Sequence, residues 1–336
     1  SGEEGNTLLT IAEQAAFEFA EVDNIGTVRN DSSYLQKHID SVLNLALVNV
    51  EAIKAAEFSV VIDAVNSTGG IFIPALLEAL GVQKITKLYC EPNGQFPHNP
   101  EPLPEHLTDL SSKIIETKAD VGFTVDPDVD RLAMVCEDGS MFGEEYTLVA
   151  VADYVLNHTP GSTVSNLSST RALKDVTEGK GEVYHVSAVG EVNVVSLMKQ
   201  TKAVIGGEGN GGIIYPESHY GRDALVGIAL FLSHLALKKC KTSQLRDSFP
   251  KYCISKNKIQ LTPDINVDDV LTQMADKYSG EEVDTTDGVK IYIEKEWVHL
   301  RKSNTEPIIR IYSESESMAA ANALANRIKG DINTFI

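Results

Sequence analysis

Apolar runs that are long enough for buried strands alternate with helical patterns over the first 250 residues. The run 59–64 (Ser-Val-Val-Ile-Asp-Ala) predicts a buried strand, and the apolar stretch 71–80, ended by Gly81, predicts a helix. The same succession continues with predicted strands at 87–90, 121–125, 162–167, 183–186 and 203–206 and predicted helices at 107–117, 146–156, 170–178, 192–200 and 223–239. Two successive β/α units of about a hundred residues each indicate two mixed α/β domains.

The pattern changes near the two ends of the chain. After residue 255, apolar and polar residues alternate as in half-exposed antiparallel strands, at 256–261, 290–294, 297–301 and 308–312, and a helical pattern follows at 318–328. At the start, one amphipathic helical pattern spans 8–19 with no strand before it. The predicted fold class is therefore α/β, with two successive mixed α/β domains followed by a smaller α+β domain that has an antiparallel sheet.

Composition narrows the class of protein. A length of 336 residues predicts two or three domains, and 43% hydrophobic residues provide an ample core. A mean hydropathy of −0.10, without a long apolar run, predicts a protein that does not act in a membrane. The net charge of −19 argues against nucleic-acid binding. The four cysteines are scattered, which favours reduced thiols and a cytoplasmic protein.

Three aspartates at alternating positions form the most informative motif. Residues 121–131 read Val-Gly-Phe-Thr-Val-Asp-Pro-Asp-Val-Asp-Arg, and Pro127 ends the apolar strand, so the carboxylates lie on a loop at its carboxyl end. Open α/β sheets bind ligands at that edge. Carboxylates this close repel one another unless a cation lies between them, and oxygen ligands favour Mg²⁺. The candidate ligands are Asp126, Asp128 and Asp130.

Other interpretations of this loop compete. A calcium loop of the EF-hand type needs glycine at its sixth position, where Arg131 stands, and helices on both sides, so we reject it. A solvated aspartate-rich turn stays open. So does a phosphatase of the haloacid-dehalogenase type, in which Asp126 would be the nucleophile. The eight histidines form no pair at helical or hairpin spacing, which argues against a zinc site.

Two further loops carry polar residues after predicted strands. Residues 205–212 read Ile-Gly-Gly-Glu-Gly-Asn-Gly-Gly, so the backbone can approach a ligand closely and only Glu208 and Asn210 offer polar side chains, which suit sugar hydroxyls. Residues 301–307 read Arg-Lys-Ser-Asn-Thr-Glu-Pro, and arginine with neutral donors suits phosphate. Taken singly, a flexible glycine turn and a polar hairpin loop explain these segments equally well or better.

The order of the three loops resembles the α-D-phosphohexomutase family, which contains phosphoglucomutase, phosphomannomutase and phosphoglucosamine mutase. The resemblance covers nearly the whole chain from about Tyr34. The matching segments are 126–131 for the metal loop, 207–212 for the sugar loop, 301–307 for the phosphate loop, and 63–70 and 96–102 for loops of the second domain.

The resemblance implies an enzyme with a central cleft, in which a phosphoserine exchanges a phosphoryl group with a hexose phosphate through a bisphosphate intermediate. The implied roles are Mg²⁺ ligands for Asp126, Asp128 and Asp130, contact with the reacting group for Arg131, binding of sugar hydroxyls for Glu208 and Asn210, and binding of the non-reacting phosphate for Arg301, Ser303, Asn304 and Thr305.

The chain departs from the family pattern in two places. No Thr-Ala-Ser-His-Asn-Pro-like segment carries a phosphoserine, so we expect a fragment that is inactive alone and completed by an N-terminal domain in the full-length protein. The specificity loop, 189–193, contains Glu191 where basic residues or histidine are common, which leaves the hexose open and admits an amino sugar. The expected division is 1–35 as the remnant of a first domain and linker, 36–144 as the metal-binding domain, 145–254 as the sugar-binding domain and 255–336 as the C-terminal phosphate-binding domain.

Three hypotheses follow from the sequence. The first is a Mg²⁺-dependent phosphohexomutase of the phosphoglucomutase/phosphomannomutase type, with phosphoglucosamine mutase as the alternative. The second is a metal-dependent phosphatase with Asp126 as nucleophile. The third is a non-catalytic module that binds sugar phosphates. The first and third predict a hexose phosphate as the ligand, and none of them requires nucleic acid or a membrane.

Overall fold

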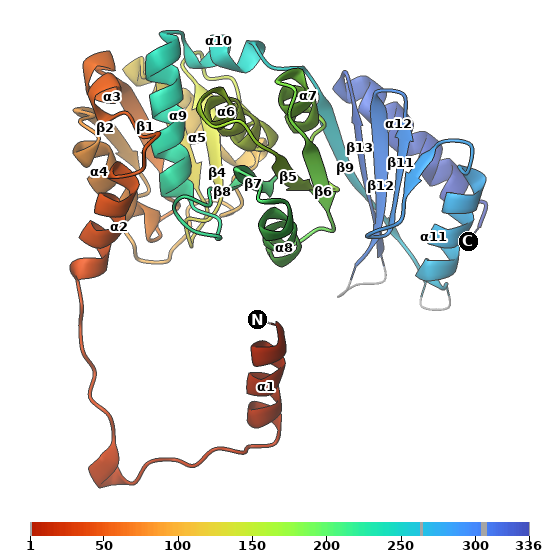
Figure 1. Ribbon diagram of the computed structural model, residues 1–336, viewed down its shortest axis with the longest axis horizontal. Helices are drawn as coiled ribbons and strands as arrows, with labels where there is room; N and C mark the ends of the chain where they lie inside the picture. Colours follow the sequence, from red (N-terminus) through yellow and green to blue (C-terminus); the bar gives the residue numbers. More distant parts are fainter. Residues whose placement is uncertain (1, 263–264, 304–307, 336) are drawn as a thin grey trace. The chain divides into compact units, whose positions relative to one another are not determined.

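The computed structural model describes residues 2–262, 265–303 and 308–335. The chain divides into two compact units, Ser1–Lys37 and His38–Ile336 (Figure 1). The first unit contains α1 (Gly2–Glu13), the 3₁₀ turn η1 (Val22–Asn24) and the start of α2 (Ser33–Leu43). The helix expected at 8–19 is therefore displaced: Ala15 has a left-handed backbone (φ +48°), which is incompatible with a continuing helix.

The second unit begins with a four-stranded sheet in the order β2-β1-β3-β4. Its strands are β1 (Ser59–Asp63), β2 (Lys84–Leu88), β3 (Val121–Val125) and β4 (Leu132–Cys136). The strand β1 pairs in parallel with β2 and β3, and β4 pairs antiparallel with β3. The strand β3 is buried along its whole length, in agreement with its continuous apolar sequence.

The second sheet repeats this arrangement. Its order is β6-β5-β7-β8, again with two parallel pairings and one antiparallel edge strand. The strands are β5 (Thr163–Asn166), β6 (Tyr184–Ser187), β7 (Ile205–Glu208) and β8 (Gly212–Ile214). In each sheet the chain first crosses to one side of the leading strand and then to the other, so each has a topological switch point between its two central strands.

The third sheet is antiparallel throughout, in the order β10-β11-β12-β13-β9. Its strands are β9 (Cys253–Gln260), β10 (Glu282–Asp284), β11 (Val289–Ile293), β12 (Glu296–Lys302) and β13 (Ile308–Ser315). The helices α11 (Val267–Lys277) and α12 (Met318–Ile332) pack on this sheet around an aliphatic core that includes Ile291, Leu300 and Ile328. The predicted fold class is confirmed: two mixed α/β sheets precede a smaller antiparallel α+β domain (Figure 1).

Helices connect and cover the first two sheets. The remaining elements are α3 (Val50–Ala56), α4 (Gly69–Ala79), η2 (Pro104–His106), α5 (Thr108–Thr117), α6 (Glu144–His158), α7 (Ala172–Gly179), α8 (Glu191–Thr201), α9 (Ala224–Lys238) and α10 (Thr242–Asp247). The helix α9 contacts β8 of the second sheet as well as β4 and α4 of the first domain, so it lies between the two α/β layers. Among the described residues, no helix is both long enough and apolar enough to cross a bilayer.

Several elements differ from the expectation. The strand expected at 87–90 is β2 at Lys84–Leu88, because Tyr89 has a left-handed backbone and ends it. The sequence analysis did not anticipate β4 or α11. The strand β4 lies only a six-residue loop after β3, and the charges of that loop drew the attention to chemistry instead of to a hairpin.

Three aromatic rings join the first sheet to α9. Phe231 of α9 makes edge-to-face contacts with Phe123 of β3 and with Phe142, at centroid distances of 6.1 and 5.4 Å. All three side chains have no measurable exposure to solvent. Aromatic pairs in this geometry add to the stabilisation from buried area, so this cluster fixes the position of α9 on the first sheet.

We predict that Phe231→Ala destabilises the protein by about 3–5 kcal/mol, because it leaves a cavity between α9 and β3. Phe231→Leu refills most of the volume and should cost less than about 1.5 kcal/mol. Urea unfolding followed by circular dichroism measures both. Equal costs for the two variants would show that the cluster does not depend on packing at this position.

Candidate functional site

The loop after β3 holds its carboxylates by bonds to its own backbone. Oδ1 of Asp126 accepts hydrogen bonds from the backbone N–H groups of Asp130 (3.1 Å) and Arg131 (3.0 Å). The backbone N–H of Val129 donates to the carbonyl of Asp126, and Val129 adopts a left-handed φ of +63°. This tight turn brings the side chains of alternating residues to one side of the loop.

One oxygen from each of Asp126, Asp128 and Asp130 lies within 4.8 Å of the others. Asp126 is buried, Asp128 is exposed, and Oδ1 of Asp130 is buried without a hydrogen-bond donor. Burial, and secondly the charge of Asp126, raises the pKa of Asp130 to about 7. An unpartnered buried oxygen and an all-oxygen donor set fit a hard divalent cation, so this group is able to hold a metal ion.

The acidic loop lies at the switch point of the first sheet. The hydroxyl groups of Ser67 and Thr68, which follow β1, both donate to the carbonyl of Pro127, at 2.6 and 2.8 Å. At the end of β1, buried Asp63 accepts a 3.0 Å contact from Nε2 of His98. His98 therefore fastens the loop 91–104 to the same sheet edge, whereas the sequence had suggested a histidine on a surface loop.

The glycine-rich loop between β7 and β8 contacts the acidic loop directly. The backbone N–H of Leu132 donates to the carbonyl of Gly211 at 3.0 Å, and Arg131 forms an isolated β-bridge with Gly212. A Cβ atom on Gly211 would lie 2.4 Å from the carbonyl oxygen of Leu132, and Gly211 has a φ of +89°. Glycine is required there because the two loops approach backbone to backbone.

The two polar side chains of this loop are held differently. Oε1 of buried Glu208 accepts from the side-chain amide of Asn166 (2.8 Å) and from the backbone N–H of Gly190 (3.3 Å). Asn166 ends β5, so Glu208 lies at the switch point of the second sheet. Asn210 is half-buried, and its Oδ1 accepts only the N–H of Gly212 among the printed side-chain bonds.

Arg222 joins the loops, and the sequence analysis did not single it out. Its guanidinium forms ion pairs with Oδ2 of Asp130, with Oε2 of Glu208 (3.1 Å) and with Oε2 of Glu191 (3.5 Å). Its backbone N–H also donates to Oε1 of Glu191 at 3.0 Å. The Arg222 side chain is only 14% exposed. One arginine therefore neutralises carboxylates from the acidic loop, the glycine-rich loop and the loop that contains Glu191.

Arg222 has a sequence neighbour that fixes the local backbone. Asp223 is the N-cap of α9, and its carboxylate accepts the N–H groups of Leu225 and Val226. The same carboxylate contacts Nε2 of His38 and of His219, each at 2.9 Å. These bonds hold the pKa of Asp223 below its usual range despite burial. An aspartate N-cap before an apolar helix is visible in the sequence, but nothing local indicates that the preceding arginine faces three carboxylates.

The loop after β12 is connected to the second sheet through Asp287. Nε of Arg301 lies 2.9 Å from Oδ2 of Asp287, which also accepts the backbone N–H of Val189 at 2.9 Å. Ser303 is buried, and its N–H donates to the carbonyl of Ile308. Asn304 and Thr305 lie outside the described residues.

His299 forms a second connection between these sheets. Nε2 of His299 lies 2.7 Å from the carbonyl of Asp287, so it donates, and Nδ1 accepts from the hydroxyl of Ser168 at 2.9 Å. Burial lowers the pKa of His299 to about 4. The imidazole is therefore neutral, and both of its nitrogens are occupied in holding the third sheet on the second.

The comparisons with known proteins agree on one family. The sequence matches the models for phosphoglucomutase/phosphomannomutase alpha/beta/alpha domain II at 36–139, alpha/beta/alpha domain III at 143–252, and the C-terminal domain at 257–330.

Relatives and solved structures extend this match. A phosphoglucomutase/phosphomannomutase of Thermococcus kodakarensis is 34% identical over 304 residues, which is 90% of this chain and 66% of that protein. A phosphoglucosamine/phosphogalactosamine mutase of Sulfurisphaera tokodaii is 29% identical and covers 90% of this chain and 67% of its own length. The crystal structure of a phosphoglucomutase/phosphomannomutase family protein from Burkholderia thailandensis superposes with a TM-score of 0.83 at 26% identity, over 99% of this chain and 70% of that one. The chain thus spans about two thirds of the length of the relatives that it matches.

We predict that a divalent cation stabilises the folded chain and that Asp128→Asn reduces this effect. At a cation concentration of about 100 times Kd, binding to the native state alone adds about 2.7 kcal/mol. Asp128 is exposed, so its replacement should not disturb the core. Unfolding midpoints with and without MgCl₂ test this, with Asp247→Asn, at a 66% exposed side chain, as the matched control. The same shift in both variants would place the cation elsewhere.

We further predict that His299 contributes to acid sensitivity. Its folded pKa of about 4 lies below the ordinary value of 6.5, so the unfolded state binds more protons between these values. Stability is then complete above about pH 6.5 and falls as the pH decreases toward 4, by up to about 3 kcal/mol.

The test compares wild type with His299→Gln by urea unfolding at pH 7.5 and pH 5. The difference at pH 7.5 measures the lost contacts, and the change of that difference at pH 5 measures the titration. His234 also has a pKa lowered to about 4 by burial, so the variant should retain part of the slope. An unaltered slope would assign the acid sensitivity to other groups.

Proposed function

Because this chain belongs to the phosphoglucomutase/phosphomannomutase family, we propose that it forms the metal-, sugar- and phosphate-binding part of a hexose-phosphate mutase. The observation that carries the proposal is the direct contact between the acidic loop and the glycine-rich loop, tied together by Arg222. Carboxylates able to hold a cation thus lie beside polar groups that suit a sugar, at the switch points of two adjoining sheets.

Asp126, Asp128 and Asp130 are proposed to hold Mg²⁺, for which their all-oxygen donor set is suited. When bound, the cation supplies positive charge that offsets the charge of a phosphoryl group. Arg131 follows directly, and its Nε lies 3.4 Å from Oδ2 of Asp126. We assign Arg131 to the reacting phosphoryl group, because its guanidinium, about one third exposed, can turn from the carboxylates toward an anion.

Glu208 and Asn210 are proposed to bind adjacent sugar hydroxyls. The bonds of Glu208 to Asn166 and Arg222 fix its carboxylate before any ligand arrives, which lowers the entropic cost of binding. Arg301, Ser303, Asn304 and Thr305 are proposed to bind the phosphate that does not react. Because Asp287 links Arg301 to Val189, the position of the phosphate loop depends on the loop that carries Glu191.

In the proposed reaction, the phosphoryl group of a phosphoserine moves to the free hydroxyl at one end of the hexose phosphate. The bisphosphate turns over, and its other phosphoryl group returns to the serine, so the net change is exchange of the 1- and 6-positions. Positioning and electrostatic stabilisation account for most of the catalysis of such transfers. The phosphoserine would come from a further domain of a longer protein, because the matched models are domains II, III and IV of the family. We expect the 336-residue chain to be inactive alone and to act in the cytoplasm, as its dispersed cysteines suggest.

An amino sugar is the second candidate substrate. Glu191 and Glu208 both pair with Arg222, which also pairs with Asp130. Three carboxylates therefore share one guanidinium, and the remaining negative charge favours a ligand with an ammonium group. This arrangement supports a phosphoglucosamine mutase, as in the relative from Sulfurisphaera tokodaii.

We predict that a full-length protein with the phosphoserine domain interconverts the 1- and 6-phosphates of a hexose in a coupled assay with Mg²⁺ and a bisphosphate activator. Glucose, mannose and glucosamine phosphates should be compared at equal concentrations. Arg301→Gln should lower kcat/KM by at least about tenfold, because a charged contact with the phosphate is lost.

The controls separate the competing functions. A phosphatase with Asp126 as nucleophile would release phosphate from the 336-residue chain alone, and Asp126→Asn would abolish that release. A binding module would bind the sugar phosphates but turn none of them over in the full-length protein. Inactivity of the full-length protein on all three sugar phosphates would reject the mutase.

A further inference from the structure

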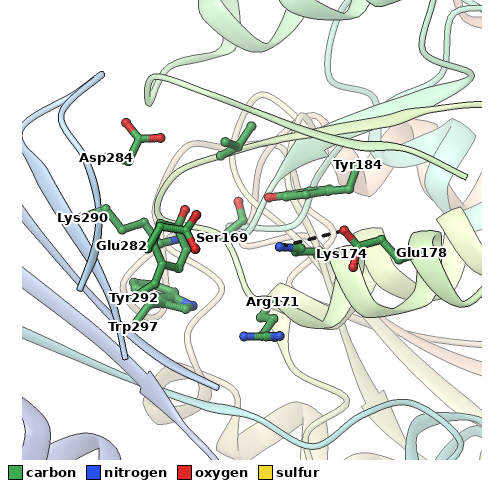
Figure 2. Close-up of a pocket in the computed structure, with 11 residues that line it drawn as sticks. Ser169, Arg171, Lys174, Glu178, Tyr184, Glu282, Asp284, Lys290, Tyr292 and Trp297 are labelled. Atoms are coloured by element: carbon green, nitrogen blue, oxygen red, sulfur yellow. Dashed lines mark ion pairs between the residues drawn. The ribbon is translucent and has the colours of Figure 1, made fainter. Parts of the chain in front are cut away.

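A cavity of about 200 Å³ lies between the second and third sheets, bounded by α7 and β6 on one side and by β10, β11 and β12 on the other (Figure 2). None of its lining residues belongs to the groups assigned above to metal, sugar or phosphate. Its volume exceeds the roughly 150 Å³ of an engineered protein cavity that binds benzene. It is therefore large enough for a small organic molecule.

A buried lysine forms the inner wall of this cavity. Lys290 is only 4% exposed, and its Nζ donates to the carbonyl of Leu167 at 2.7 Å. The same nitrogen lies 4.0 Å from the centre of the Trp297 ring and 4.9 Å from that of Tyr292. Among the described residues, no carboxylate oxygen lies within 4.0 Å of it. An ammonium group with one carbonyl and two ring faces still lacks an anionic partner.

Burial lowers the pKa of Lys290 to about 7, and the charges of Glu314 and Asp284 act in the opposite direction. A lysine with an ordinary pKa near 10.4 would be fully charged at neutral pH. The wall therefore carries only a partial charge in the free protein. An anion in the cavity would restore the charged form, so binding of an anion should take up a proton.

The two sides of the cavity carry opposite charges. Figure 2 shows Lys174 on one side, with Arg171 below it, and Glu282 and Asp284 on the opposite side beside Lys290. Among the described residues, no ion pair closer than 4.0 Å crosses from one side to the other. Lys174 has only a distant partner within its own helix, Glu178 at 3.9 Å. The basic and acidic groups thus face each other across the cavity without contact.

We propose that this cavity binds a small zwitterion, whose anionic group is held by Lys290, Lys174 and Arg171 and whose ammonium group faces Glu282 and Asp284. A dianion alone would meet the two carboxylates, and a cation alone would meet the three basic groups. A molecule with both charges satisfies both sides, and the rings of Tyr184 and Tyr292 provide flat walls for its carbon atoms.

Such a ligand would tie the second sheet to the third. Its anionic end contacts α7, and its ammonium end contacts β10, so it spans the boundary that His299 and Asp287 also bridge. The cavity also reaches toward the glycine-rich loop, because Ser169 lines it and the hydroxyl oxygen of Ser169 accepts the N–H of Gly209 at 2.9 Å. Occupancy therefore bears on the position of Glu208, whatever reaction the protein performs.

The test uses O-phosphoethanolamine as the zwitterion and monoethyl phosphate as its counterpart without the ammonium group. Isothermal titration of the 336-residue chain should show one saturable site that binds phosphoethanolamine at least about tenfold tighter than monoethyl phosphate, the factor expected from one added charge-assisted contact. Proton uptake should appear as a heat that changes with the ionisation enthalpy of the buffer.

Two variants identify the walls. Lys174→Gln should weaken both phosphates by about tenfold, whereas Asp284→Asn should weaken phosphoethanolamine only. Both side chains are partly exposed, so folding should survive. Lys251→Gln, at a 68% exposed lysine, is the matched control and should change neither affinity.

The proposal is overturned if phosphoethanolamine shows no saturable binding, if the two phosphates bind equally, or if Arg301→Gln abolishes binding while Lys174→Gln does not. The last result would place the anion in the loop after β12. These titrations measure binding without turnover, so their outcome is independent of whether the protein proves to be a mutase.

Discussion

Arg222 lies among carboxylates that three separate loops bring to one place. Asp130, Glu191 and Glu208 would repel one another at this distance, in a chain whose net charge is already −19. The guanidinium resolves this conflict because its planar fork presents donors in several directions at once and stays charged when it is largely buried. The geometry of the acidic loop and that of the glycine-rich loop therefore depend on the same cation.

The repeated sheet order explains why these loops meet. Each α/β sheet places the loops after its two central strands at a switch point, where Ser67 bonds Pro127 in the first and Asn166 bonds Glu208 in the second. The helix α9 and the cluster around Phe231 hold the two layers together. The antiparallel sheet joins them through Asp287 and His299, which are polar contacts. The connection to the third sheet is therefore the one most open to control by charge and by a bound molecule.

The membership in the family and the fold class were both within reach of the sequence. Strands such as β3 are buried on both faces, so their apolar runs are continuous, and the motif at 126–131 is a local arrangement whose spacing carries its chemistry. Boundaries were less secure. The strand β2 was placed three residues late, because only its left-handed end residue, Tyr89, decides where it stops. The roles assigned to Glu208, Asn210 and Arg301 stay predictions.

The sequence by itself determined which residue types stand at the ends of the strands, since a strand, its terminating proline or glycine and the carboxylates that follow are neighbours along the chain. It did not contain the partner of those carboxylates. Arg222 is separated from Asp130 by more than a whole domain's succession of strands and helices, and Lys290 faces Lys174 only because two sheets pack together. Pairing and burial between distant segments are decided by tertiary packing, because charge compensation depends on distance in space and leaves no periodic pattern in the chain.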